Sequence, residues 1–275
     1  MVRKLPVVHQ PASPACADAL VVSTGRPDGL MAVASRPGVG GKIEIEAADD
    51  FILTQPTSIT GGTFAGLLLG SGVTVSDIQS VTIDFYRVFP KDSAFPPSGN
   101  VPTRVNSPSD VAFNSRSSGT ADLKFIAKVL SNTFTVNNSV LNGINKKPNQ
   151  QTLREGPVTG QEIIFSFSIS PDLLPSDHYF FVPQVQLSDG EFMWLSAPKP
   201  IVSGTPLTPD LQAWIRNEEL APDWLRVGTD IVGGSPAPTF NASFSLDGVT
   251  ATPEPSSLLL LGAGSLGITL LRRNR

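Results

Sequence analysis

The sequence predicts an all-β fold: a two-sheet antiparallel, jelly-roll-like sandwich with one short helical excursion. Only 16% of its 275 residues are charged, whereas 25 are proline and 24 are glycine, a composition typical of a chain with many turns. About ten short apolar or alternating runs lie between these turn residues. Alternating strands need only one buried face each, and two packed sheets provide it.

Strand signals in the first half of the chain are short runs separated by turns. In residues 42–46, Ile43 and Ile45 lie on one face and charged side chains on the other, which predicts a half-solvated strand. Residues 89–118 hold five prolines and few apolar side chains, which indicates a long surface loop. The strands predicted here are 20–23, 30–35, 42–46, 57–69 with a break at Gly61-Gly62, and 81–86.

The second half continues the same pattern with longer strands. Residues 123–130 and 134–141 are predicted to form a hairpin around a polar turn. Residues 162–170 place Ile and Phe on one face, and a polar loop at 142–160 precedes them. Residues 179–187 are the most apolar run, so we expect a central strand there. Pro183 should cause a bulge in it, because proline cannot donate a ladder hydrogen bond.

Two further features complete the domain. The turn Ser188-Asp189-Gly190 predicts a hairpin from the central strand into residues 192–195, and residues 240–246 form the last strand. Residues 209–220 show helical spacing of large apolar side chains, and Pro222 ends that pattern. We therefore expect the domain's one helix at 209–220.

The last 24 residues form a tail with three parts. Pro253, Glu254 and Pro255 are stiff and extended. Ser256 to Leu271 carries no charge and predicts a single transmembrane helix of about 24 Å, slightly short of a hydrocarbon core of about 30 Å. At the end, Arg272, Arg273 and Arg275 would snorkel to the headgroups and, as cytoplasmic anchors, place everything before Pro253 outside.

This order of Pro-Glu-Pro, apolar segment and arginine cluster resembles the PEP-CTERM sorting signal of Gram-negative bacteria. The resemblance covers only the tail. It implies recognition by an exosortase-type membrane enzyme, cleavage near Pro-Glu-Pro, and delivery to the cell surface or an exopolysaccharide matrix. Until cleavage, the tail and its lipid contacts would hold the chain in the inner membrane. A plain tail anchor is the alternative.

The chain is thus predicted to have three parts: a leader at 1–19, a sandwich domain at 20–250 and the sorting tail at 251–275. In the leader, Arg3 and Lys4 resemble the basic start of a signal peptide. The following residues are interrupted by three prolines and form no apolar core, so we expect a degenerate leader or a truncated start.

The composition and the motifs limit which functions the protein can have. A net charge of −4 argues against nucleic-acid binding, and a single cysteine, Cys16, excludes an intramolecular disulfide and a multi-cysteine zinc site. Asp177 and His178 are adjacent, so in a strand they point to opposite faces and form no dyad. We therefore expect no enzyme and no cofactor. Asp49 and Asp50, at the mouth of a predicted strand, are possible calcium ligands.

Glycan binding requires exposed aromatic side chains that stack on sugar faces. Trp194 is the candidate, because it lies near the predicted hairpin tip; packing in the core is the alternative. Trp214 and Trp224 are expected to attach the helical excursion to the sandwich.

These observations predict a surface-exported structural or binding protein associated with extracellular polysaccharide. A carbohydrate-active hydrolase on the same sandwich and an inert matrix or adhesion component remain alternatives, because a fold does not decide function.

Overall fold

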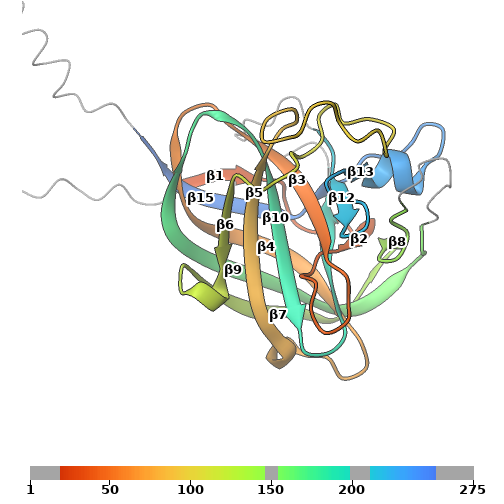
Figure 1. Cartoon of the computed structure of the whole chain (residues 1–275). Coiled ribbons are helices and arrows are strands. Elements are labelled where there is room, and N and C mark those ends of the chain that lie inside the picture. The colour runs from red at the N-terminus through yellow and green to blue at the C-terminus, as the bar shows by residue number, and fades with distance from the viewer. Residues whose placement is uncertain (1–18, 146–153, 199–210, 252–275) are drawn as a thin grey trace, which may run out of the picture.

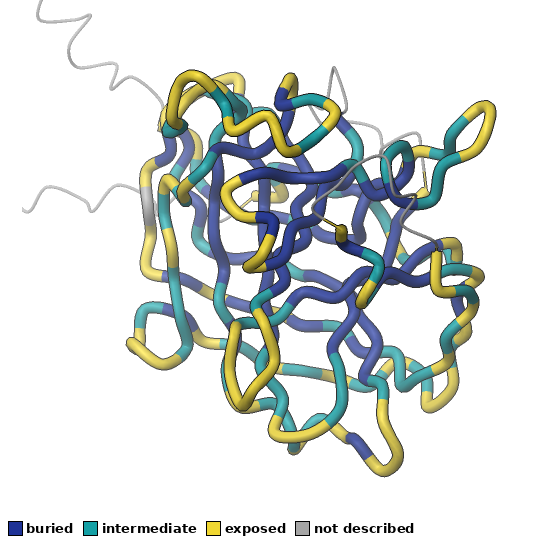
Figure 2. Tube along the Cα trace, turned by 45° about the vertical axis from the view of Figure 1, so that its right-hand side comes forward, coloured by how far each residue is buried: buried dark blue, intermediate teal, exposed yellow. Residues whose placement is uncertain are grey.

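The computed structural model describes residues 19–145, 154–198 and 211–251. Most of these residues lie in strands, which form two sheets packed against each other, as the sequence predicts (Figure 1). The predicted leader, up to residue 18, and the predicted transmembrane helix lie outside the described residues. Buried residues concentrate in the strands and exposed residues in the loops that join them (Figure 2).

The larger sheet has nine strands and is built around β4 (Thr57–Leu69). One edge of β4 pairs with β15 (Phe244–Thr250) and then with β11 (Glu191–Ala197), while β9 (Val158–Leu174) pairs along the other edge. The remaining strands are β1 (Ala19–Ser23), β2 (Met31–Ala34), β7 (Leu123–Val136), β8 (Asn138–Val140) and β14 (Asn241–Ala242). The pair β2–β8 is parallel, so the expectation of a wholly antiparallel sheet is wrong.

The smaller sheet has six strands, with β10 (Asp177–Leu187) between β3 (Ile45–Leu53) and β5 (Ile78–Arg87). The prediction of a central strand here is confirmed. Its bulge lies between Gln186 and Leu187, not at Pro183, which pairs regularly with Ile83. The pairing with β3 ends at Phe181, so no ladder hydrogen bond is lost at the proline. The outer strands are β13 (Leu225–Arg226), β12 (Trp214–Asn217) and β6 (Asn114–Ser117).

Aromatic side chains fill the space between the sheets. Phe181 of β10 stacks on Phe167 of β9 and on Phe244 of β15, with ring centroids 5.8 and 5.0 Å apart. Phe64 of β4 stacks on Phe165 of β9 at 4.5 Å. Pairs of this kind stabilise a core by about 0.5–1.5 kcal/mol beyond the apolar area that they bury. The alternation predicted for residues 162–170 is therefore confirmed as a core-facing pattern.

Two predicted interruptions are wrong because neighbouring strands override the local signal. β4 runs through Gly61-Gly62, where neighbours approach so closely that a Cβ on Gly62 would lie 2.1 Å from the carbonyl oxygen of Ser245. β7 continues as one strand of 14 residues where a hairpin turn was expected, because it pairs with β9 along its whole length and absorbs the polar residues as register shifts.

The predicted hairpin at Ser188-Asp189-Gly190 is also wrong. β10 belongs to the smaller sheet and β11 to the larger, so this turn crosses between the two layers. The segment between β2 and β3 crosses between the same layers. Strand β3 begins only at Ile45, and Ile43 is 39% exposed, so the strand expected at 42–46 is shifted toward the C-terminus.

The helix expected at 209–220 is wrong: its described part contains strand β12, which is followed by a turn. β12 pairs with β3, placing Trp214 opposite Ala48 and Ile215 opposite Ala47. Trp214 packs in an apolar cluster on the outer face, whereas Ile215 packs in the core, an alternation that one strand provides. Helical structure is limited to two short 3₁₀ turns, η1 (Val75–Asp77) and η2 (Ser118–Thr120), and to a six-residue π-helix, η3 (Val227–Val232), within the described ranges.

Of the segment predicted as a surface loop at 89–118, residues 89–113 cover the outer face of the smaller sheet and have buried anchors, whereas residues 114–117 form its edge strand β6, so the loop prediction is wrong there. Arg104 is 6% exposed, and its guanidinium donates to Asp223 at 2.7 Å and to Asp110 at 2.8 Å. The indole of Trp224 donates to the carbonyl of Ser109 at 3.1 Å. Ion pairs and hydrogen bonds thus attach this segment, which has few apolar side chains, to the smaller sheet.

Candidate functional site

The attachment point of the sorting tail lies at one corner of the sandwich. Strand β15 ends at Thr250, and the amide of Ala251 donates to the carbonyl of Pro56 at 2.9 Å. Strand β1 pairs with β15 so that Ala19 lies opposite Gly248. The chain therefore enters and leaves the described domain at neighbouring strand ends (Figure 1), and the tail continues directly from a strand of the larger sheet.

A row of hydroxyl groups crosses the outer face of the larger sheet. Ser23, Ser245, Thr63 and Ser166 occupy paired positions on β1, β15, β4 and β9. The hydroxyls of Thr63 and Ser245 are 2.8 Å apart and hydrogen-bonded. We call these four residues the hydroxyl face. Neighbouring strands lie about 4.8 Å apart, so the row presents polar groups at nearly equal intervals.

A hollow of about 730 Å³ lies over part of the hydroxyl face. Its floor includes Ser23, Thr63 and Ser245, and its rim includes Arg26 and Glu162. Burial raises the pKa of the Glu162 carboxyl above its ordinary value. The hollow therefore combines hydroxyl donors and acceptors with one charge of each sign.

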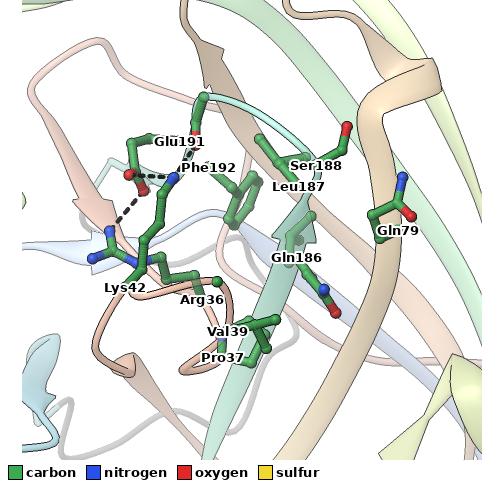
Figure 3. A pocket seen from close by; sticks show the side chains of 13 residues that line it. Arg36, Pro37, Val39, Lys42, Gln79, Gln186, Leu187, Ser188, Glu191 and Phe192 are labelled. Atoms are coloured by element: carbon green, nitrogen blue, oxygen red, sulfur yellow. Dashed lines mark hydrogen bonds and ion pairs between the residues drawn. The ribbon is translucent and has the colours of Figure 1, made fainter.

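A second cavity, of about 260 Å³, lies at one end of the sandwich, where two connections cross between the sheets (Figure 3). We call it the crossover pocket. The β2–β3 connection contributes Arg36 and Lys42, and β11 contributes Glu191. The opposite wall comes from the end of β10 and the start of β5, with Gln186 and Gln79.

One carboxylate in the crossover pocket meets two cations. Glu191 accepts from Arg36 Nη1 at 2.6 Å and lies 2.7 Å from Lys42 Nζ. Lys42 Nζ also donates to the carbonyl of Gly190 at 2.5 Å. Gly190 has a φ of +74°, which favours glycine, and a Cβ there would lie 2.2 Å from the carbonyl oxygen of Leu69. The turn that brings Glu191 to the pocket therefore requires glycine.

A buried polar cluster lies between the smaller sheet and its covering segment. Glu46 accepts from the hydroxyl of Tyr86 at 2.5 Å and pairs with Arg216. Asp84, 8% exposed, lies near this cluster. Burial raises the pKa of its carboxyl to about 7; a hydrogen bond from Ser115 opposes this effect, and the negative charge of Glu46 adds to it. The cluster therefore contains a carboxyl that titrates near neutral pH.

Trp194, the predicted glycan platform, is completely buried. Its indole Nε1 donates to the carbonyl of Ser243 at 3.0 Å, and its ring packs against Phe181 and Phe244. Because its turn crosses between the sheets, Trp194 faces the core instead of a hairpin surface. The platform role is thus corrected, and the core alternative describes Trp194. Trp214 and Trp224 are buried too.

The predicted calcium ligands lie inside β3, not at the mouth of a strand. Asp49 accepts from the amide of Ala242 at 2.8 Å. Asp50 accepts from the amide of Leu211 at 2.9 Å and lies 2.6 Å from His178 Nε2. Within the described ranges, no three acidic, histidine or cysteine residues form a group that could hold a metal ion. Both aspartates instead connect β3 to neighbouring segments.

Asp177 and His178 diverge as the alternation predicts. Asp177 pairs with Lys91 at 2.6 Å, whereas His178 contacts Asp50 on the adjacent strand.

Sequence reasoning missed Arg36, Lys42 and Glu191, the charged residues of the crossover pocket. The available signal was charge beside two glycine turns, Pro37-Gly38 and Asp189-Gly190, but only the fold reveals that these turns meet.

Comparison with known proteins supports the interpretation of the tail. The family of PEP-CTERM protein-sorting motifs matches residues 251–275. Such a motif implies processing by an exosortase and export to the cell envelope or surface. No curated protein and no solved structure matches the chain. In the described part of the chain, no helix is both long and apolar enough to span a membrane.

Proposed function

We propose that this protein is displayed at the cell surface as a binding protein of the extracellular polysaccharide matrix. The observation that carries the proposal is the sorting motif at 251–275, which follows directly from the last strand of the domain. Cleavage near Pro253 to Pro255 by an exosortase would then release a domain that ends at the corner of the sandwich. Before cleavage, Ser256 to Leu271 would span the inner membrane, with the arginines on the cytoplasmic side.

The hydroxyl face is the surface that we assign to polysaccharide contact. A sugar chain offers hydroxyl groups that both donate and accept, and serine and threonine hydroxyls do the same. Because neighbouring strands lie about 4.8 Å apart, the row offers a repeating series of polar contacts to an extended sugar chain. Because each contact replaces a hydrogen bond to water, affinity per site is expected to be weak.

Replacing the paired hydroxyls should reduce polysaccharide retention without unfolding the domain. In the double variant Thr63→Val and Ser245→Ala, two partly buried hydroxyls that bond to each other are both removed, so no group is left unpaired. Cosedimentation of the full chain, purified in detergent, with polysaccharide from the host matrix should fall several-fold. The thermal midpoint should change little.

Thr135 and Thr159 provide a matched control, because their hydroxyls form a similar cross-strand pair, 2.7 Å apart, on exposed positions of β7 and β9. Replacing both by valine should leave retention unchanged. Equal retention by both double variants would contradict the assignment of the hydroxyl face. Absence of retention by the native chain would favour an inert matrix component, and shortening of the polysaccharide would favour the hydrolase.

The jelly-roll order of connections between the strands stays a prediction.

A further inference from the structure

The crossover pocket holds more hydrogen-bond donors than its own carboxylate uses. A guanidinium carries five N–H donors. Within the described residues, the Arg36 side chain makes one hydrogen bond, from Nη1 to Glu191. Its side chain is only 12% exposed, and its Nε is buried with no partner among the described residues. The donors left for an acceptor in the pocket are therefore those of the two Nη atoms, since Arg36 Nη2 makes no hydrogen bond within the described residues.

The charge of the crossover pocket favours an anion. Arg36 and Lys42 supply two positive charges, and Glu191 is the one acid among the described residues that line the pocket. Lys42 Nζ forms two contacts, with Glu191 and Gly190, so one of its three donors is free within the described residues. The pocket is thus net positive in a chain whose net charge is −4.

The other lining residues of the crossover pocket can contact the ring and the hydroxyl groups of a sugar. Gln186 uses its Oε1 to accept from Ser80 at 2.9 Å, and among the described residues its amide donors have no acceptor and are left for a ligand. Gln79, on the neighbouring strand β5, also lines the pocket (Figure 3). Val39 and Leu187 offer apolar contact, and the volume of about 260 Å³ suits one sugar residue better than a long chain.

We propose that the crossover pocket binds the carboxylate of an acidic sugar residue, a hexuronate at an end or branch of a polysaccharide. The carboxylate accepts from Arg36 and Lys42, while sugar hydroxyls meet the amides of Gln79 and Gln186. Arginine and carboxylate can pair through two parallel hydrogen bonds, which distinguishes this ligand from a neutral sugar. The site is separate from the hydroxyl face and goes beyond the general matrix association by specifying an acidic component.

The test is titration of the full chain in detergent with glucuronate, followed by NMR or calorimetry. Lys42→Met should weaken glucuronate binding about tenfold, because a charge-assisted contact is lost. Added salt should weaken binding further. Lys91→Met is the matched control and should bind like the native chain, since Lys91 pairs with Asp177 at the start of β10, whereas the pocket lies at the end of that strand.

Arg36→Lys is a second variant that preserves the charge but loses the planar donors, and it should also bind more weakly. Equal affinity for glucose and glucuronate would overturn the proposal, as would native-like binding by Lys42→Met. Acetate that binds as well as glucuronate would reveal a general anion site and no sugar site. If the native chain does not bind glucuronate but still retains polysaccharide, only the proposal for the crossover pocket is wrong. If it binds glucuronate but does not retain polysaccharide, only the assignment of the hydroxyl face is wrong.

Discussion

Replacing Trp194 by alanine should lower the free energy of unfolding by about 3–5 kcal/mol, as expected when a large buried aromatic side chain is removed from a core. The indole is completely buried, and its rings lie 5.8 Å from Phe181 and 5.9 Å from Phe244. The variant also leaves the carbonyl of Ser243 without its indole donor. Denaturant unfolding monitored by circular dichroism measures the change.

Phe95→Ala is the control for this experiment, because Phe95 is an aromatic side chain that is 83% exposed. Its removal should change the free energy of unfolding by no more than about 0.5 kcal/mol. If Trp194→Ala instead kept the native midpoint and lost polysaccharide retention, Trp194 would be a binding platform and its position in the core would be wrong.

The stability of the native protein should decrease as the pH rises from about 4 to about 7, and Asp84→Asn should remove much of this decrease. Burial raises the pKa of the Asp84 carboxyl from 3.8 to about 7. Between these values the folded protein holds a proton that the unfolded chain releases. The stabilising effect of that proton is therefore present at acid pH and lost as the pH passes through 7, amounting to on the order of 4 kcal/mol.

The comparison requires free energies of unfolding at several pH values for both proteins. Asp122→Asn is the control, because a hydrogen bond from Thr120 lowers the pKa of this half-buried carboxyl and the slope near neutral pH should stay native. Parallel stability curves for the native protein and Asp84→Asn would show that Asp84 is ionised and solvated in the folded state, against its burial here.

Local patterns predicted strands better than connections. Residues 162–170 and 179–187 revealed β9 and the central β10 because their alternation or continuous apolar character depends only on burial. The two predicted hairpins failed for a different reason. A polar turn between two strands is the same sequence signal whether the chain returns to the same sheet, crosses to the other sheet or, as in β7, does not turn at all.

The expected helix at 209–220 shows the same limit. Leu211, Trp214 and Ile215 fit one helical face, but pairing with Ala47 and Ala48 of β3 lets one strand bury Trp214 and Ile215 on opposite sides. Long-range pairing of this kind is invisible to a local pattern. The sorting tail is the opposite case, since its three parts are contiguous in sequence and need no partner from the fold.

The same difference between local patterns and long-range pairing applies to the site residues. Trp194 was proposed as a surface residue because it followed a turn, yet that turn leads into the core. Arg36, Lys42 and Glu191 come together only because two crossing connections meet at one end of the sandwich. Sequence reasoning could identify neither this meeting nor the pairing that aligns Ser23, Ser245 and Thr63 across three strands.

We propose that the tail delivers this domain to the cell surface and is then removed. The most direct measurement is mass spectrometry of the chain, expressed behind a functional signal peptide, after surface release from a host with an exosortase. We expect a C-terminus between Thr252 and Ser257 and loss of surface delivery when residues 252–275 are deleted. Surface recovery only of chains that end at Arg275, or equal delivery without the tail, would contradict it.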